Sequence, residues 1–262
     1  MKTSVVVTTY NRPDALKKVL EGLHHQTILP DEVIVADDGS GPDTGEMIRN
    51  FKRDSLYPLH HVWQEDKGFM AARIRNKAIL ESGGDYLISL DGDCVPGKHF
   101  IADHRRLAEK GYFFQGKRIL VSKPLASLFT HEDANSFGKL LRYAFTNRLK
   151  NCHHLIRMVR FPSTACAHLK GIKSCNMGFF RNDIFAVNGF NEDFVGWGRE
   201  DSELAVRLFK YGLKRKGHPF MAICFHLWHE ENNRDRLSIN DELLQSAAKA
   251  NGYICNNGLV KK

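Results

Sequence analysis

The first 91 residues alternate between short apolar runs and segments with helical spacing. Four apolar runs predict strands, of which the third along the chain is the weakest: 4–9, 33–36, 59–63 and 86–90. Apolar residues between these runs recur every three or four positions and predict helices after Pro13, around 47–51 and over 70–78. Strands that alternate with helices are typical of βαβ units. The pattern therefore predicts an α/β fold, with a Rossmann-like, mostly parallel central sheet flanked by helices.

The second part of the chain has a less regular pattern. Strands are predicted at 113–121, 174–180 and 220–225, and helices at 137–145, 204–211 and 234–250. We find no internal repeat, low-complexity segment or clear linker between the two parts. At 262 residues the chain has ample length for one large core, so we expect a single domain over 1–262.

Three of the predicted strands end in a cluster of polar residues: Thr8-Thr9-Tyr10-Asn11, Asp37-Asp38-Gly39-Ser40 and Asp91-Gly92-Asp93. Ligands of open α/β sheets bind beyond the carboxyl ends of the strands, which a parallel sheet aligns at one edge. Two carboxylates separated by a glycine can approach one cation, and Mg²⁺ or Mn²⁺ commonly lies between protein carboxylates and substrate phosphates. One such tripeptide is equally compatible with a polar loop. Three clusters on strands of one parallel sheet predict a ligand site.

Composition narrows the class of protein. Apolar residues make up 42% of the chain and charged residues 26%, which is ordinary for a soluble globular protein. No apolar run approaches the ~20 residues that span a bilayer. The N-terminus enters a strand-like run without a signal-peptide pattern, and the six cysteines lack CxxC pairing. We therefore expect a cytoplasmic protein with reduced cysteines.

The positive charge is concentrated in one stretch. The chain has a net charge of +8, and residues 134–182 contain nine Lys or Arg residues but no Asp or Glu. A local basic face marks an anionic partner. We expect this partner to be the inner face of an anionic membrane, which the protein would contact peripherally, or a phosphorylated glycolipid acceptor. The alternative is a solvated basic face beside the active site.

The polar clusters resemble motifs of the inverting family 2 glycosyltransferases, which have the glycosyltransferase-A fold. Thr8-Thr9-Tyr10-Asn11 resembles their PTYN strand end, with Thr8 in place of proline, while 37–40 resembles DDGS and 91–93 resembles DxD. Residues 64–78 are similar to the segment QxDxGFxxAxxRNxA. Residues 196–201 resemble the GWGxED motif of galactosyltransferases, which also occurs in bacterial chondroitin-type polymerases. The matched motifs run from Ser4 to His229 and leave 112–170 and the tail unmatched.

The resemblance implies an activity. It implies a metal-dependent transfer of a hexose or N-acetylhexosamine from a UDP-sugar donor to a saccharide or glycolipid acceptor, in the synthesis of a bacterial surface polysaccharide or lipopolysaccharide. It also implies a division of labour along the chain. Residues 1–111 would bind the nucleotide sugar, and residues 112–262 would bind the acceptor and supply the catalytic base.

The resemblance also implies roles for the residues at the strand ends. Asp38 would hydrogen-bond the uracil ring, and Thr9 and Tyr10 would line the nucleotide pocket. Asp91 would contact the ribose, or the metal through a water molecule. Asp93 would bind Mn²⁺ or Mg²⁺ on the diphosphate, where the metal neutralises charge on the leaving group.

Five further residues have weaker signals. Arg73 and Asn76 share a helix face and could reach the nucleotide or its phosphates. An exposed helix face that binds no ligand would have the same sequence pattern. His226 and His229 lie three apart after a predicted strand. By resemblance His229 is the third metal ligand and His226 its alternate. Trp197 would stack on the acceptor sugar, with a place in the core as the alternative.

Glu200 and Asp201 are the candidate catalytic acids, at the start of the helix predicted over 204–211. Neighbours on a helix point about 100° apart, so these two side chains should have different roles. The resemblance puts the general base at the second acid of the motif, Asp201, and leaves Glu200 to bind sugar hydroxyls. The alternative is that both acids only stabilise the helix start.

Two other functions are compatible with parts of the sequence. A nucleotidyltransferase that makes the activated sugar would also bind nucleotide and metal on an α/β sheet. Such an enzyme usually has a glycine-rich basic loop after the first strand, where this chain has Asn11-Arg12-Pro13. A nucleic-acid-binding protein would explain the positive charge, but no RRM, KH or helix-turn-helix signature accompanies it. We therefore expect no nucleic-acid partner.

Overall fold

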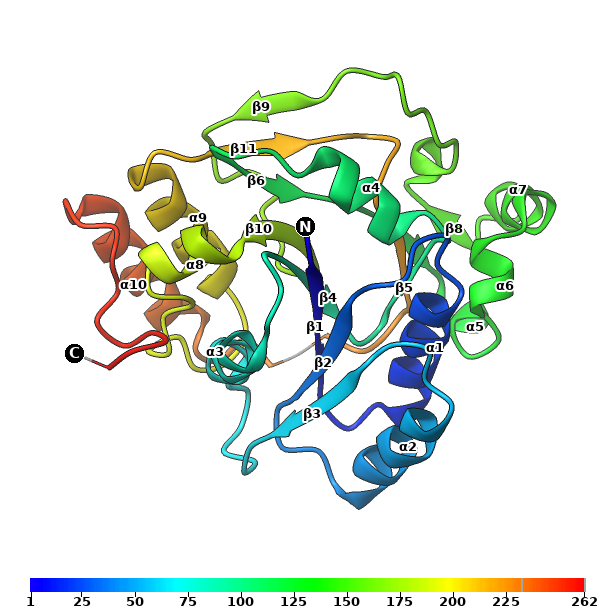
Figure 1. Ribbon diagram of the computed structural model, residues 1–262, viewed down its shortest axis with the longest axis horizontal. Helices are drawn as coiled ribbons and strands as arrows, with labels where there is room; N and C mark the ends of the chain where they lie inside the picture. The colour runs from blue at the N-terminus through cyan, green and yellow to red at the C-terminus, as the bar shows by residue number, and fades with distance from the viewer. Residues whose placement is uncertain (232, 262) are drawn as a thin grey trace.

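The computed structural model describes residues 1–231 and 233–261 and contains a large, mostly parallel sheet at its centre (Figure 1). The order of its eight strands is β3-β2-β1-β4-β10-β6-β11-β9. Their bounds are Leu59–Trp63, Glu32–Asp37, Thr3–Thr9, Tyr86–Asp91, Asn176–Phe180, Tyr112–Gln115, Lys214–Gly217 and Thr164–Cys166. The strands β10 and β9 are antiparallel to their neighbours, and the others run in one direction. The predicted fold class is confirmed.

A smaller sheet lies beside the large one and contains β5 (Cys94–Pro96), β12 (Ile223–His226), β7 (Lys117–Val121) and β8 (Leu149–Lys150), in that order. The single strand predicted over 113–121 is therefore wrong, because the chain divides at Gly116 into β6 and β7. A Cβ atom at Gly116 would lie 2.2 Å from the Asn176 amide nitrogen, so only glycine permits this close crossing between the sheets. The strand predicted over 220–225 begins later, at Ile223.

Helices cover both faces of the large sheet (Figure 1). The helices of the chain are α1 (Pro13–His24), α2 (Pro42–Arg53), α3 (Ala71–Glu81), α4 (Phe100–Leu107), α5 (Lys123–Ala126), α6 (His131–Ala134), α7 (Phe137–Phe145), α8 (Arg181–Ala186), α9 (Glu200–Lys210) and α10 (Leu237–Lys249), with a 3₁₀ turn at Cys152–His154. Val5 and Val7 pack with α1, α2 and α4, whereas Val6 packs with α3, α8 and α9. This alternation follows from the two-residue period of a strand.

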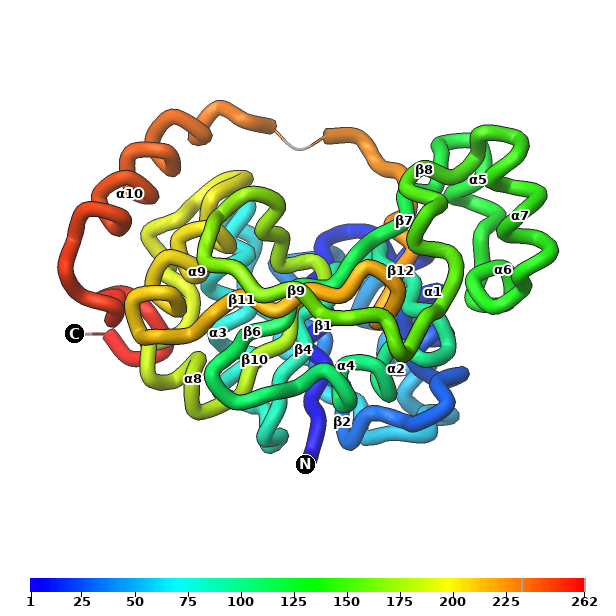
Figure 2. Tube along the Cα trace, turned by 90° about the horizontal axis from the view of Figure 1, so that it is seen from above, coloured from blue at the N-terminus to red at the C-terminus, as the bar shows by residue number. Residues whose placement is uncertain are grey.

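The register of the parallel strands brings the polar clusters to one edge. Thr9 pairs with Asp37 of β2, and Thr8 pairs with Asp91 of β4. The helix α10 packs against α9 at the end of the molecule opposite α5, α6 and α7 (Figure 2). Among the described residues, no helix has both the length and the apolar character needed to cross a bilayer.

Candidate active site

A cavity of about 850 Å³ opens beyond the carboxyl ends of β1 and β4. Its walls come from both parts of the chain. Ten of the twelve residues expected at the site line it: Thr9, Tyr10, Asp38, Asp91, Asp93, Trp197, Glu200, Asp201, His226 and His229. Arg73 and Asn76 are not part of its wall. The tertiary structure thus gathers residues that lie far apart in the sequence into one concave surface.

Three of these side chains form a cluster that can hold a metal ion. One ligand atom from each of Asp93, His226 and His229 lies within 4.8 Å of the other two. The Nε2 atom of His229 is 3.4 Å from Asp93 Oδ2, and that of His226 is 3.6 Å from Asp93 Oδ1. Pairing of β5 with β12 sets His226 opposite Cys94, the residue after Asp93. Strand pairing therefore places His226 beside the carboxylate, and His229 reaches it from the segment that follows β12.

The donor set of this cluster fits a divalent cation. Burial lowers the pKa of His226 to about 4, although the charge of Asp93 opposes the shift. Its imidazole is therefore neutral at pH 7 and has a free lone pair for a metal. Two imidazoles and one carboxylate suit a transition metal such as Mn²⁺ better than Mg²⁺, which prefers a shell of oxygen atoms.

Arg12 also contacts the metal-site carboxylate, a contact that sequence reasoning missed. Its Nη1 atom donates to Asp93 Oδ2 at 2.7 Å, and its Nη2 atom donates to the Trp228 carbonyl at 3.4 Å. The side chain is one-third exposed and lines the cavity. The only signal in the sequence was its place, directly after the first polar strand end and before Pro13, which opens α1.

Asp38 lies in a buried corner of the cavity. Its Oδ2 atom accepts a hydrogen bond from the Met70 amide at 2.8 Å, and its Oδ1 atom accepts one from Gln64 Nε2 at 2.6 Å. Burial raises the pKa of its carboxyl group, and the two hydrogen bonds oppose that shift. The Asp38 amide donates to the Thr9 carbonyl at 2.9 Å, so the first two strand ends are tied together. Tyr10 is half-exposed, and its hydroxyl donates to Asp66.

Arg75 is the cation that α3 contributes to the cavity, and neither Arg73 nor the uncharged Asn76 lines it. Its guanidinium donates to Glu200 Oε1 at 3.1 Å, to Asp91 Oδ1 at 3.2 Å and to Thr8 Oγ1 at 3.1 Å. The side chain is buried, so removal of either carboxylate would leave part of its charge unpaired, which in buried pairs costs about 3–5 kcal/mol. Arg75 therefore positions the acids of β4 and α9 relative to β1.

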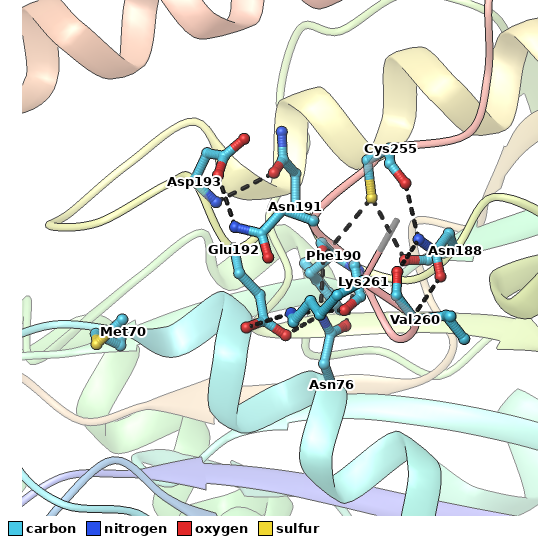
Figure 3. A network of polar contacts seen from close by, with 12 residues as sticks. Met70, Asn76, Asn188, Phe190, Asn191, Glu192, Asp193, Cys255, Val260 and Lys261 are labelled. Atoms are coloured by element: carbon cyan, nitrogen blue, oxygen red, sulfur yellow. Dashed lines mark hydrogen bonds and ion pairs between the residues drawn. The ribbon is translucent and has the colours of Figure 1, made fainter.

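Asn76 lies outside the cavity wall and makes hydrogen bonds to the loop that precedes Trp197. Its Nδ2 atom donates to the Phe190 carbonyl at 2.8 Å and to Glu192 Oε1 at 2.9 Å, and its Oδ1 atom accepts from the Phe190 amide (Figure 3). Lys261 pairs with Glu192 on the same side. Both N–H groups of this buried side chain donate within the protein, so Asn76 anchors the loop that leads to Trp197.

Glu200 and Asp201 have different surroundings, as their spacing predicts. Glu200 is buried against Arg75, and burial together with the charge of Asp201 raises its pKa to about 6. Asp201 is half-buried at the cavity wall, where its Oδ2 atom accepts from the Ser174 amide at 3.3 Å. Both carboxylates thus contact groups outside α9. Asp201 is the acid with the freer access to a ligand.

Two tryptophans line the cavity. Trp197 is 37% exposed, and the Arg234 guanidinium lies 4.9 Å from its ring centroid. Trp228, which sequence reasoning missed, is equally exposed and lies under the Lys123 ammonium at 4.3 Å. Neither ring is in the core. Partly exposed rings held by cations can offer a flat apolar face to a sugar.

The comparison with protein families decides the identity of this domain. The model described as glycosyl transferase family 2 matches residues 4–166, more than half of the chain. The chain belongs to glycosyltransferase family 2. A second model, described as the N-terminal domain of galactosyltransferase, matches residues 146–230 and covers the Gly-Trp-Gly segment with both acids. The predicted family and enzyme class are confirmed.

Curated relatives of this family 2 domain include two polysaccharide synthases. The chain is 28% identical to chondroitin synthase of Escherichia coli over 92% of its own length and 38% of that protein. It is 29% identical to hyaluronan synthase of Pasteurella multocida over 80% of its length and 23% of that protein. The chain therefore spans less than half of the length of these relatives.

Solved structures share the glycosyltransferase-A fold with this domain. S. aureus TarS 1-349 in complex with UDP-GlcNAc aligns with a TM-score of 0.68 and 16% identity, over 94% of this chain and 66% of that chain. The mannosyltransferase PcManGT from Pyrobaculum calidifontis, in complex with GDP-Man and Mn²⁺, aligns with a TM-score of 0.59 and 19% identity, over 88% and 58%. At these identities the likeness concerns the fold alone.

Proposed function

We propose that this family 2 domain transfers a hexose or N-acetylhexosamine from a UDP-sugar to a saccharide or glycolipid acceptor, with inversion and with a divalent metal. The observation that carries the proposal is the shared cavity. Its wall contains Asp38, the cluster of Asp93, His226 and His229, and the half-buried carboxylate of Asp201. Relatives named as chondroitin and hyaluronan synthases support a role in bacterial surface polysaccharide synthesis.

The mechanism assigns separate tasks to the residues of the cavity. Asp38, with its two oxygens held, binds the uracil ring, and Asp91 contacts the ribose. Asp93 and the two histidines would hold Mn²⁺, or Mg²⁺ as the poorer fit. A metal bound there would neutralise negative charge on the departing diphosphate. Asp201 takes the proton from the acceptor hydroxyl, which attacks the anomeric carbon from the face opposite the diphosphate.

A thermal-shift panel of nucleotide sugars tests the donor. UDP-sugars with Mn²⁺ should raise the melting temperature most, because they are the proposed donors and should bind most tightly. A ligand that binds only the folded state adds about 2.7 kcal/mol of stability at 100 times its Kd. GDP- and dTDP-sugars should raise it less, and chelation should remove the difference. Stabilisation by free nucleoside triphosphate alone would favour a nucleotidyltransferase. Retention on a random oligonucleotide at modest salt would favour nucleic-acid binding.

We also propose that the domain contacts an anionic bilayer through the outer face of α7, as a peripheral protein on the inner membrane. Phe137, Leu141 and Phe145 follow one another at four-residue intervals on this helix, and Phe145 is 85% exposed. Arg142 lies beside this apolar stripe, within the stretch that has no acidic residue. The helix lies at the edge of the molecule with α5 and α6 (Figure 2). An apolar stripe flanked by arginine is typical of an interfacial helix.

Charge favours lipid over a second copy of the chain on this face. A two-fold contact brings the same surface of both copies together, so the basic stretch would meet itself. Anionic lipid instead attracts each nearby Lys or Arg by ~1 kcal/mol.

Vesicle sedimentation tests the contact. The wild-type domain should sediment with vesicles of phosphatidylserine and phosphatidylcholine at low salt, and Phe145→Ser should weaken partitioning about tenfold or more. Burial of a phenylalanine side chain contributes about 1.5–3 kcal/mol, and 1.4 kcal/mol is a factor of ten. Leu56→Ser, at an exposed leucine between α2 and β3, is the matched control. Equal sedimentation with pure phosphatidylcholine would contradict the proposal.

A further inference from the structure

The cations that line the active-site cavity fall into two groups. Four of them pair with carboxylates: Arg12, Arg75, Arg199 and Arg234. Within the described part of the chain, the other three have no carboxylate oxygen within 4.0 Å: Arg118, Lys150 and Lys173. We call these three residues the basic wall. The mechanism above uses none of them.

Strand pairing puts two members of the basic wall on one face of the small sheet. Lys150 of β8 is the register partner of Leu120 of β7. Leu120 and Arg118 are two residues apart on β7, so their side chains point to the same face, and both line the cavity. Lys150 and Arg118 are therefore diagonal neighbours, with a spacing of about 7–8 Å.

The third member joins the wall from the segment before β10. Arg118 Nη1 is 3.7 Å from the Sγ atom of Cys175, two residues after Lys173. The Ser174 amide donates to the Oδ2 atom of Asp201 at 3.3 Å. Lys173 is thus adjacent in sequence to the residue that holds the proposed base, and its side chain is exposed at the cavity.

The position of the wall connects it with the acceptor. The acceptor hydroxyl must lie next to Asp201 to lose its proton. The donor diphosphate belongs beside the cluster of Asp93, His226 and His229, where Arg12 and the metal supply positive charge. An acceptor whose hydroxyl lies next to Asp201 would also lie beside Lys173, because Ser174 separates these two residues. Cations without carboxylate partners around a concave surface concentrate anions there.

We propose that the acceptor is an anionic saccharide and that Lys150, Lys173 and Arg118 bind its negative group. This proposal rests on the transfer reaction proposed above. The group is a carboxylate or a phosphate on the sugar that presents the attacking hydroxyl, or on its neighbour. Ammonium groups attract either anion as point charges, and a guanidinium can bind either through two parallel hydrogen bonds.

Variants of the two lysines give the cleaner test, because the charge of Arg118 also acts on Asp91 and His226. We would measure binding of glycosides by saturation-transfer NMR with UDP and Mn²⁺ present, so that no turnover is needed. The probes are 4-nitrophenyl β-glucuronide, methyl glucoside 6-phosphate, and the two uncharged glucosides. The glucuronide and the phosphate distinguish a carboxylate from a phosphate acceptor.

The wild-type domain should bind at least one charged probe about tenfold more tightly than its uncharged partner at low salt. Lys150→Ala with Lys173→Ala should remove that preference, and the two arginine replacements at the same positions should largely retain it. Lys214→Ala is the matched control, at an exposed lysine of β11 outside the cavity. Binding of UDP with Mn²⁺ should not change in any of these variants.

Several results would overturn the inference. One is an absence of any preference for a charged probe in the wild-type domain, and another is a preference that persists in the double variant. A parallel loss of UDP affinity in the double variant would assign the lysines to the donor diphosphate instead. Failure of UDP and Mn²⁺ to bind the wild-type domain would count against the proposed transfer reaction, so the two failures are distinguishable.

Discussion

Asp201→Asn is expected to lower kcat by about 10²- to 10⁴-fold, the usual contribution of a general base. The side-chain oxygen of the variant can still accept the Ser174 amide, which is 3.3 Å from Asp201 Oδ2, so the backbone around the base should keep its shape. What the variant loses is a group that can take a proton. Binding of UDP-sugar and metal should therefore survive, and isothermal titration with UDP and Mn²⁺ would check this.

Glu200→Gln is the matched comparison, since the two acids are neighbours on α9. Burial suits Glu200 to a positioning role, because its carboxylate already contacts Arg75 at 3.1 Å. Its pKa of about 6 would suit a base at neutral pH, but a base must first reach the proton that it removes. We expect this variant to raise KM and to lower stability. If Glu200→Gln instead loses turnover while Asp201→Asn keeps it, the two roles are reversed.

Chelation by EDTA is expected to abolish transfer, and added Mn²⁺ should restore it more fully than Mg²⁺. Asp93→Ala should lower kcat/KM by about 10³-fold or more, because a Lewis acid on the diphosphate contributes several kcal/mol to the transition state. The same variant should lose the Mn²⁺-dependent rise in melting temperature, a readout that does not depend on turnover.

The fold of the Asp93→Ala variant should remain intact. The partner that it leaves unpaired, Arg12, is one-third exposed, and exposed ion pairs contribute only about 0–1 kcal/mol. Asp54→Ala, at an exposed acid after α2, is the control and should match the wild-type domain in both assays. Undiminished transfer in excess chelator would contradict a metal-dependent mechanism.

The sequence by itself determined the central sheet and the edge at which the site lies. The apolar runs at 4–9, 33–36 and 86–90 became β1, β2 and β4, because a strand covered on both faces must be apolar throughout. Parallel pairing then aligns their polar ends, so Asp38, Asp91 and Asp93 could be predicted to share a site. These inferences depend on local pattern and on one general rule of sheet topology.

The tertiary structure alone decided which side chains meet across long distances in the chain. Pairing of β12 with β5 brings His226 to Asp93, a contact that three-residue spacing between two histidines does not specify. Without the resemblance to a family, these histidines would have been assigned to structure. The spacing on α3 also favoured Arg73 and Asn76, but burial selected Arg75, because the side of a helix that faces the sheet depends on packing.

The division of the strand predicted over 113–121 also depends on a contact between segments that lie far apart in the sequence. Both β6 and β7 are extended and carry apolar residues, at 112–114 and 119–121, and the sequence is interpreted as one strand across the polar residues Gln115, Lys117 and Arg118. Only the close approach of Asn176 requires a glycine there, and that contact joins residues about sixty positions apart. Local periodicity therefore determined the elements and the edge of the sheet. Pairing and packing between distant segments determined the ligand cluster, the buried arginine and the basic wall.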